Sequence, residues 1–190
     1  MKFIDPDTDI GGPLQKFPVT NHSAIVAARS DDEIIRRRAF DTILYGGLVV
    51  GILDLIFAFT FYGLIRGAPP LRIFQSVAAG LLGRPAAYEG GVKTFVFGIL
   101  LHFVVATCIA TVYFLASRVL PIMIRHPVVS GLTYGMIAYL GMNYLVVPLS
   151  AIRRSPGPIK LPIFLTEVIG HAFLVGLPLA LLAHRSAKKK

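Results

Sequence analysis

The sequence lacks most of the features that mark a soluble enzyme or a disulfide-bonded protein. Of its 190 residues, one is a cysteine and only 15% are charged. The single cysteine, Cys108, excludes an intrachain disulfide and a CxxC metal or redox motif. The sequence also has no Walker loop, dinucleotide fingerprint, HExxH motif or GxSxG nucleophile elbow. We therefore expect no enzymatic activity and assign no catalytic residue.

Acidic residues are fewer than basic ones, and the formal net charge is +9 at pH 7. A basic chain can bind nucleic acid, but this one has no groove-reading motif and no basic face rich in aromatic side chains. The basic residues instead flank the apolar segments of the chain. This distribution favours anionic lipid headgroups at the cytoplasmic face as partners and does not favour nucleic acid.

What the sequence has in abundance is apolar residues, which make up 55% of the chain. They fall in blocks of about twenty, the length that crosses a bilayer as one helix. Four such blocks predict spanning helices at about residues 43–65, 95–117, 128–149 and 163–183. A shorter amphipathic segment, residues 70–82, predicts an interfacial helix between spans 1 and 2. The expected fold is an all-α membrane protein, a four-transmembrane-helix bundle with one interfacial helix.

Four spans place both termini on the same side of the membrane. The basic clusters nearest to the membrane are Arg36–Arg38 and Lys188–Lys190, and the positive-inside rule makes their side cytoplasmic. The polar N-terminal region has no early apolar core, so we expect span 1 to act as an uncleaved insertion signal. We divide the chain into a cytoplasmic N-terminal arm (1–35), a transmembrane domain (36–185) and a basic cytoplasmic tail (186–190).

Two pairs of glycines at four-residue spacing predict close helix packing. Gly47 and Gly51 form a GxxxG motif in span 1, and Gly131 and Gly135 form another in span 3. Glycine allows the backbone of a neighbouring helix to approach closely. These two faces are therefore also candidate surfaces for a homo-oligomer. In span 4, Pro178 predicts a weakened or kinked later half of the helix.

Five polar side chains interrupt the apolar blocks: Asp54, His102, Asn143, Glu167 and His171. Such residues are costly in hydrocarbon, so they usually face protein or water. The four-residue spacing of Glu167 and His171 places both on one face of span 4. Counted from the outer helix ends at ~1.5 Å per residue, all five lie roughly 6 to 16 Å deep. The sequence predicts that they form one polar cluster in the outer half of the bundle.

Three roles for these residues stay open. The first, which we favour from the sequence, is a small structural or accessory membrane subunit in which polar contacts hold the helices together. The second is a proton- or ion-linked transporter or sensor, in which Glu167 and His171 exchange a proton with Asp54 or His102. The third is a cofactor site, with the two histidines as axial haem ligands or with all four residues around a divalent metal. No cofactor motif accompanies them, so the cofactor is unknown.

Several short motifs occur in a recognisable order along the chain. They are Arg36–Arg38 before span 1, His102 in span 2, Pro148-Leu149 at the end of span 3, and Glu167-x-x-Gly170-His171 early in span 4. This order resembles that of the YagU-type bacterial inner-membrane proteins over about residues 36–185. The outer connection after span 1 differs, and the N-terminal arm has no counterpart. The resemblance implies a polytopic protein of the bacterial inner membrane without an assigned reaction.

Overall fold

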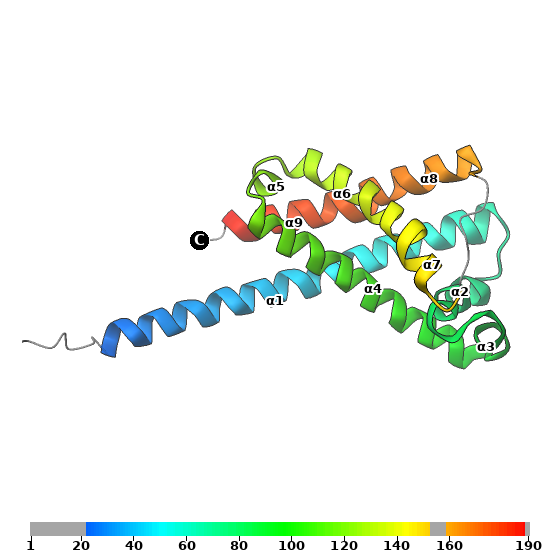
Figure 1. Ribbon diagram of the computed structural model, residues 1–190, viewed down its shortest axis with the longest axis horizontal. Helices are drawn as coiled ribbons and strands as arrows, with labels where there is room; N and C mark the ends of the chain where they lie inside the picture. Colours follow the sequence, from blue (N-terminus) through cyan, green and yellow to red (C-terminus); the bar gives the residue numbers. More distant parts are fainter. Residues whose placement is uncertain (1–21, 153–158, 189–190) are drawn as a thin grey trace, which may run out of the picture. The chain divides into compact units, whose positions relative to one another are not determined.

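The computed structural model describes residues 22–152 and 159–188, and the side chains of residues 39–152 and 159–188 (Figure 1). The chain divides into two units, residues 1–36 and 37–190, and every contact given below belongs to the second. Most of the predicted N-terminal arm, and the side chains of Arg36–Arg38, lie outside the described residues. Throughout the described ranges the elements are helices and no strand occurs. The prediction of an all-α fold is confirmed.

Four stretches of helix are long and apolar enough to cross a membrane. Span 1 is Ala39–Ile65, span 2 is Gly91–Val119, span 3 is Pro127–Leu149 and span 4 is Leu161–Lys188. At ~1.5 Å per residue, even the shortest of them exceeds the ~30 Å of hydrocarbon in a bilayer. The four-span prediction is therefore confirmed, and the chain is an integral membrane protein.

The spans are built from α-helices and from three π-helical segments, in which the backbone hydrogen bond reaches one residue further. Span 1 comprises the later part of α1 (His22–Ala58) and the π-helix η1 (Phe59–Ile65), and span 2 is α4 (Gly91–Val119). Span 3 comprises α6 (Pro127–Gly141), η2 (Met142–Val146) and α7 (Val147–Leu149). Span 4 comprises α8 (Leu161–His171), η3 (Ala172–Gly176) and α9 (Leu177–Lys188).

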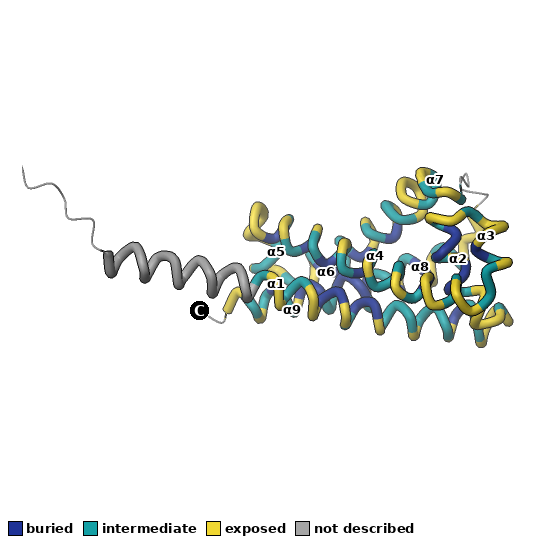
Figure 2. Tube along the Cα trace, turned by 90° about the horizontal axis from the view of Figure 1, so that it is seen from below, coloured by how far each residue is buried: buried dark blue, intermediate teal, exposed yellow. Residues whose placement is uncertain are grey.

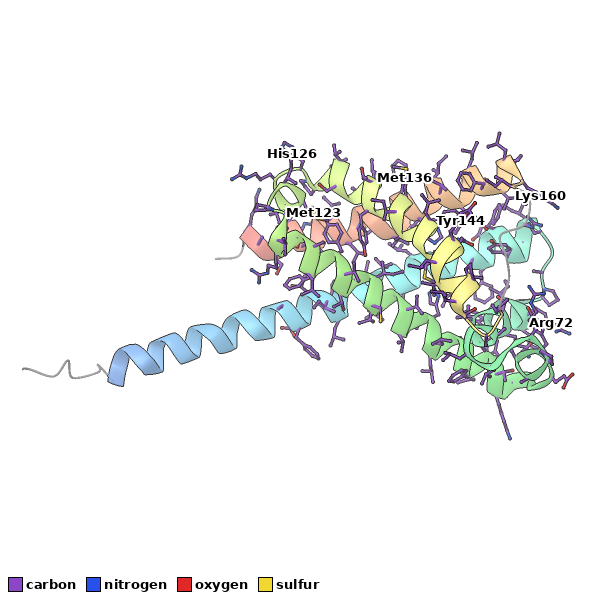
Figure 3. All side chains as sticks on the ribbon, viewed as in Figure 1. Arg72, Met123, His126, Met136, Tyr144 and Lys160 are labelled. Carbon is purple, nitrogen blue, oxygen red and sulfur yellow. The ribbon has the colours of Figure 1, made fainter. Side chains whose placement is uncertain are left out.

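Short helices close the two ends of the bundle. At one end, α2 (Pro70–Leu82) and α3 (Arg84–Glu89) connect spans 1 and 2, and we call this the α2 end (Figure 1). At the other, the C-terminal end, α5 (Ile122–Arg125) connects spans 2 and 3. Figure 3 shows Arg72 and Lys160 at the α2 end and His126 at the C-terminal end. Side chains that carry or can take up positive charge thus lie at both ends of the apolar spans.

The predicted helix between spans 1 and 2 is present as α2, and it packs tightly over span 2. The Phe74 backbone lies so close to Gly98 that a Cβ at this glycine would overlap it. The Gln75 side chain is fully buried, and its Nε2 donates to the Gly91 carbonyl oxygen at 3.1 Å. The ring centroids of Phe74 and Phe95 lie 5.1 Å apart. These contacts make α2 an integral part of the bundle.

The glycines of the two GxxxG motifs lie where helices of the same chain cross (Gly47, Gly51, Gly131 and Gly135). A Cβ on Gly51 would lie 2.6 Å from the ring of Phe103 in span 2, and one on Gly131 would lie 2.8 Å from the Cβ of Ala180 in span 4. Because both glycine faces are already covered within the chain, a homo-oligomer would need another surface.

The interior between the spans is apolar toward the C-terminal end. Its buried residues, which we call the apolar core, are Val50, Ala110, Tyr113, Val175, Leu179, Ala180 and Ala183. Large apolar side chains are also exposed on all four spans, and Figure 2 shows exposed positions in yellow among the buried and intermediate ones. A water-soluble protein rarely exposes so much contiguous apolar surface, whereas a bilayer requires it.

Prolines account for two of the three π-helical segments. Pro148 comes two residues after η2, and Pro178 comes two residues after η3. Proline has no N–H to donate, and its ring clashes with the carbonyl four residues earlier, so the helix widens just before it. The expected disturbance of span 4 by Pro178 therefore falls in the segment before the proline, and the helix continues through it.

Candidate functional site

Glu167 lies at the junction of three spans. Its carboxylate side chain is buried, and the neighbouring residues of α8 are mostly apolar. One carboxylate oxygen, Oε1, accepts a hydrogen bond from the Tyr62 hydroxyl of η1. The other, Oε2, accepts one from the Tyr139 hydroxyl of α6 at 2.5 Å. The carboxylate thus has a donor for each oxygen, and it connects span 4 to spans 1 and 3.

His171 lies one turn further along the same face, where its own backbone fixes the ring. Its Nδ1 lies 2.9 Å from the carbonyl oxygen of Glu167. A carbonyl oxygen can only accept, so Nδ1 carries a hydrogen and donates it. This leaves Nε2 as the nitrogen that faces Asp54 of span 1, with 3.8 Å between Nε2 and Oδ1. The tautomer of neutral His171 follows from this geometry.

The contact between Asp54 and His171 is attractive or repulsive according to whether one of the two groups carries an added proton. With Nδ1 protonated, a neutral His171 presents the lone pair of Nε2 to the lone pairs of an ionised Asp54, which is repulsive. Adding a proton to either group produces an attraction, as imidazolium facing carboxylate or as carboxylic acid facing imidazole. The side chains are 19% and 25% exposed, so the protein does not seal this pair completely.

Tyr139 connects the two halves of the site. Its hydroxyl binds Glu167, and its ring packs edge-on against the His171 ring with 5.2 Å between centroids. Phe164 contacts the Tyr139 ring as well, at 5.7 Å. We call the set of Asp54, Tyr62, Tyr139, Glu167 and His171 the polar cluster. A movement of the His171 ring therefore acts directly on Tyr139, the tyrosine whose hydroxyl binds Glu167.

His102 does not join the polar cluster in the contacts that the structure describes. Its Nε2 lies 2.9 Å from the Gly51 carbonyl oxygen of span 1, and since a carbonyl accepts, Nε2 is the donor. Gly51 precedes Asp54 by three residues, so His102 lies about one turn away from the site along span 1. Its bond ties span 2 to span 1 close to the Gly51–Phe103 crossing.

Asn143 was expected to point inward, and the structure places it on the outside of span 3. In a regular helix it would continue the inward face of Gly135 and Tyr139 at steps of four. The π-helical segment η2 begins at Met142 and turns the following residues relative to α6. Asn143 is exposed, and its Nδ2 donates to the Tyr139 carbonyl oxygen of its own helix at 3.1 Å.

Neither Tyr62 nor Tyr139 was predicted from the sequence as part of the site. A signal for Tyr62 was present, because Asp54, Ala58 and Tyr62 follow one another at four-residue steps on one helical face. A tyrosine within a span also needs a partner for its hydroxyl. Tyr139 continues the inward glycine stripe of span 3 in the same way. Both tyrosines could therefore have been assigned as donors to Glu167.

The arrangement does not favour the metal and haem hypotheses. Among the residues that the structure describes, no group of three or more His, Cys, Asp or Glu side chains could hold a metal ion. The oxygens of Glu167 are both bound by tyrosines. The Nε2 atoms of His102 and His171 are both directed toward groups of span 1. Ligation by these four residues would require several of these contacts to break.

All three π-helical segments lie next to the polar cluster. Tyr62 is part of η1, Tyr139 lies three residues before η2, and His171 lies directly before η3. Such segments are rare, and they occur frequently at functional sites, where they re-aim side chains. Their position here marks the polar cluster as the part of the bundle that departs most from regular helix geometry.

Comparison with known proteins adds no assignment to these observations. No protein-family model, no curated protein and no solved structure matches this chain. The resemblance to YagU-type proteins therefore stays a prediction, and the function has to be inferred from the geometry of the site.

Proposed function

We propose that this integral membrane protein is a proton-linked transporter or sensor whose working group is the Asp54–His171 pair. The observation that carries the proposal is the orientation of His171. Because Nδ1 donates to a backbone carbonyl, Nε2 faces Asp54 at 3.8 Å, where a proton added to either group turns a repulsive contact into an attractive one. Proton uptake and release at this pair is the chemistry that the site supports best.

Glu167 and Tyr139 provide the route by which the proton can change the fold. Gain or loss of this proton alters the charge of the Asp54–His171 pair by one unit. The His171 ring packs against Tyr139, and the Tyr139 hydroxyl holds Glu167. A shift of the ring toward or away from Asp54 therefore acts on the contact between spans 3 and 4. This is the two-state element that a proton-driven sensor or carrier requires.

The ionisable character of the residues also supports this proposal. A contact that only holds helices together can be made with neutral amides and hydroxyls, as Tyr134 does when it donates to the Ile109 carbonyl oxygen at 2.6 Å. An ionisable side chain at the centre of a bilayer costs roughly 2.5 kcal/mol or more. Two carboxylates and an imidazole in one cluster are therefore better explained by proton binding than by adhesion.

A second candidate is the structural or accessory membrane subunit, and the geometry of Glu167 favours it. Each of its carboxylate oxygens is bound by a tyrosine from a different span. In this case the polar cluster stabilises the bundle, with roughly 0.6 to 2 kcal/mol per interhelical hydrogen bond. The two candidates differ in what happens when the cluster loses its ability to titrate but keeps its hydrogen bonds.

The proposal includes the bacterial inner membrane as location, with both termini on the cytoplasmic side. It is supported by the basic clusters Arg36–Arg38 and Lys188–Lys190 of the sequence and by the YagU-type order of motifs. Anionic lipids at the cytoplasmic face are the corresponding partners.

The test is a proton titration of the protein reconstituted in liposomes, followed by infrared difference spectroscopy of the carboxyl groups. In the spectrum of the wild type minus that of Asp54→Asn, we expect a carboxyl band that changes with pH. His171→Gln should shift the pH at which that band changes. The matched control is Tyr134→Phe, which removes a tyrosine hydroxyl from the same helix as Tyr139 but beside the apolar core. It should leave the titration unchanged.

The same liposomes, loaded with a pH-sensitive dye, report whether protons cross the membrane. A transporter predicts proton flux that Asp54→Asn abolishes, whereas a sensor predicts titration without flux. If Asp54→Asn and His171→Gln lower the thermal stability alone, with titration and flux as in the wild type, the proton-linked proposal fails. The structural subunit is then the better description.

A further inference from the structure

Span 3 combines two properties that conflict for a helix surrounded by lipid. Of the four spans described, it has the lowest mean hydropathy and also the smallest buried share. A span that exposes more of its surface to hydrocarbon should be more apolar than its neighbours, because exposed polar groups are costly there. Span 3 is instead both the least apolar span and the most exposed one, which indicates that another protein surface covers it.

Several exposed residues of span 3 recur at three- and four-residue steps and form a stripe, and Leu145 and Val146 are exposed as well. This span-3 face consists of Thr133, Met136, Ile137, Leu140, Asn143 and Tyr144. Figure 3 labels Met136 and Tyr144 along this stretch of the helix. Two of its members, Thr133 and Asn143, are polar side chains in the middle of an apolar block.

Asn143 is the residue of the span-3 face that most needs a hydrogen-bond partner. Its Nδ2 donates once, to the Tyr139 carbonyl oxygen. In the part of the chain that the structure describes, the second N–H and the Oδ1 of this amide have no hydrogen-bond partner. Asn143 lies six residues before Leu149, or ~9 Å from the end of the span, which is deeper than the headgroups reach. An amide in hydrocarbon without its hydrogen bonds costs roughly 2 to 7 kcal/mol.

We propose that the span-3 face is the interface between two copies of this chain, with Asn143 of one copy hydrogen-bonded to Asn143 of the other. A second copy fits because the amide is self-complementary: it offers a donor and an acceptor at once. A two-fold axis along the membrane normal brings identical residues together at identical depth. The remaining donor and acceptor of each Asn143 are then satisfied by the same groups of its mate.

The rest of the bundle is compatible with this pairing. The GxxxG faces, the usual surfaces for close helix association, are occupied by spans 2 and 4 of the same chain. Tyr139 is buried with its hydroxyl on Glu167, so its side chain points away from the span-3 face. Pairing therefore leaves the polar cluster intact, and this proposal does not depend on the proposed proton-linked function.

Cysteine crosslinking in membranes tests the interface, and the native Cys108 provides a control. Cys108 is exposed on span 2, outside the span-3 face, so oxidation of the wild type should form no disulfide-linked dimer. The variant Leu140→Cys in a Cys108→Ser background places a thiol on the span-3 face and keeps Asn143. We expect this variant to form a disulfide-linked dimer upon oxidation. Equal crosslinking of Cys108 and of Leu140→Cys would contradict the interface.

Substitution of Asn143 tests the hydrogen bond itself, in the Cys108→Ser chain reconstituted at decreasing protein-to-lipid ratios. Single-molecule photobleaching then gives the dimer dissociation constant. We expect Asn143→Leu to weaken the dimer roughly 8- to 900-fold, the range of the two interhelical hydrogen bonds that the reciprocal amide pair makes. Asn143→Gln, which keeps a self-complementary amide, should retain most of the affinity. Thermal unfolding of each variant in detergent controls for the fold of the monomer.

Two results would overturn the proposal. One is a chain that stays monomeric at every density, which would mean that lipid, water or a different protein satisfies Asn143. The other is a dimer whose dissociation constant is the same in Asn143→Leu as in the parent chain, which would mean that the copies associate through another surface.

Discussion

Tyr134 and Tyr139 lie on the same helix, α6, and each donates a hydrogen bond to another span, yet their acceptors differ. Tyr134 packs against the apolar core and donates to the Ile109 carbonyl oxygen at 2.6 Å. Tyr139 donates to the Glu167 carboxylate at 2.5 Å. A backbone carbonyl does not take up or release a proton, whereas a carboxyl group can do both. The same side chain thus forms a fixed helix contact in one half of the bundle and part of a protonatable site in the other.

The backbone differs between the two halves as well. Around the apolar core, span 2 is a continuous α-helix and span 3 is regular α-helix. Around the polar cluster, spans 1, 3 and 4 each contain a π-helical segment. Regular helices make up most of the part where small and apolar side chains interlock, and Val175 of η3 also belongs to that apolar core. Irregular turns occur where polar side chains from three spans have to be brought to one point, and this contrast is what the following substitutions test.

The largest effect is expected from Glu167→Ala, which leaves the hydroxyls of Tyr62 and Tyr139 without their acceptor. One buried and one half-buried hydroxyl without a partner should lower the free energy of unfolding by roughly 2 to 4 kcal/mol. Glu167→Gln keeps a polar group between the tyrosines and should cost less. Denaturant unfolding in detergent measures both, with the exposed Glu89→Ala of α3 as control. Equal losses for the two Glu167 variants would show that the tyrosines do not depend on the carboxylate.

Gly135→Ala should have the next largest effect, because a methyl group there overlaps the backbone of His171 and Ala172 in span 4. Overpacking of this kind costs roughly 1 to 3 kcal/mol. Gly141 lies on the same helix with nothing within 4 Å of an added Cβ. Gly141→Ala should therefore leave the stability unchanged or raise it by roughly 0.5 to 1 kcal/mol. Similar losses for both variants, measured as thermal unfolding, would contradict the close crossing of spans 3 and 4.

The paired variants Tyr134→Phe and Tyr139→Phe sharpen the comparison most. Each removes one interhelical hydrogen bond, so each should lower the free energy of unfolding by roughly 0.6 to 2 kcal/mol. Only Tyr139→Phe is expected to change the proton titration as well, because Tyr139 contacts both Glu167 and His171. If both variants titrate like the wild type, Tyr139 is no more than a helix contact.

The smallest effect is expected from Thr166→Val, the immediate neighbour of Glu167. Thr166 is exposed, and its hydroxyl donates to the Pro162 carbonyl oxygen within the same helix at 2.8 Å. Its loss should change the free energy of unfolding by less than roughly 0.5 kcal/mol. A loss as large as that of Glu167→Ala would show that the whole segment is sensitive, and that the effect of Glu167 is not specific.

Much of the fold could be predicted because hydropathy is a strong and local signal. Each block of about twenty apolar residues has one stable solution in a bilayer, a spanning helix. The meeting of Asp54, Glu167 and His171 was also accessible from the sequence. Their cost in hydrocarbon requires a partner, and the four-residue spacing of Glu167 and His171 places them on one face.

The remaining details depend on small changes of helix geometry that the residue pattern does not contain. Asn143 was expected in the cluster because polar side chains are costly in hydrocarbon, and the π-helical segment η2 turns it outward. His102 was expected in the polar cluster, but it binds the nearby Gly51 carbonyl oxygen. A histidine on an inward face can satisfy itself with backbone or side-chain acceptors, and the sequence alone does not distinguish between these.

The central claim is that His171 keeps its proton on Nδ1 and exchanges the one on Nε2 with Asp54. Nitrogen NMR of histidine-labelled protein in bilayers tests it directly, with His171→Gln used to assign the signal. We predict that Nδ1 stays protonated throughout the pH titration, that Nε2 changes, and that Asp54→Asn shifts the pH of that change. A neutral His171 that carries its hydrogen on Nε2 would contradict the account, because Nδ1 would then be unable to donate to the Glu167 carbonyl.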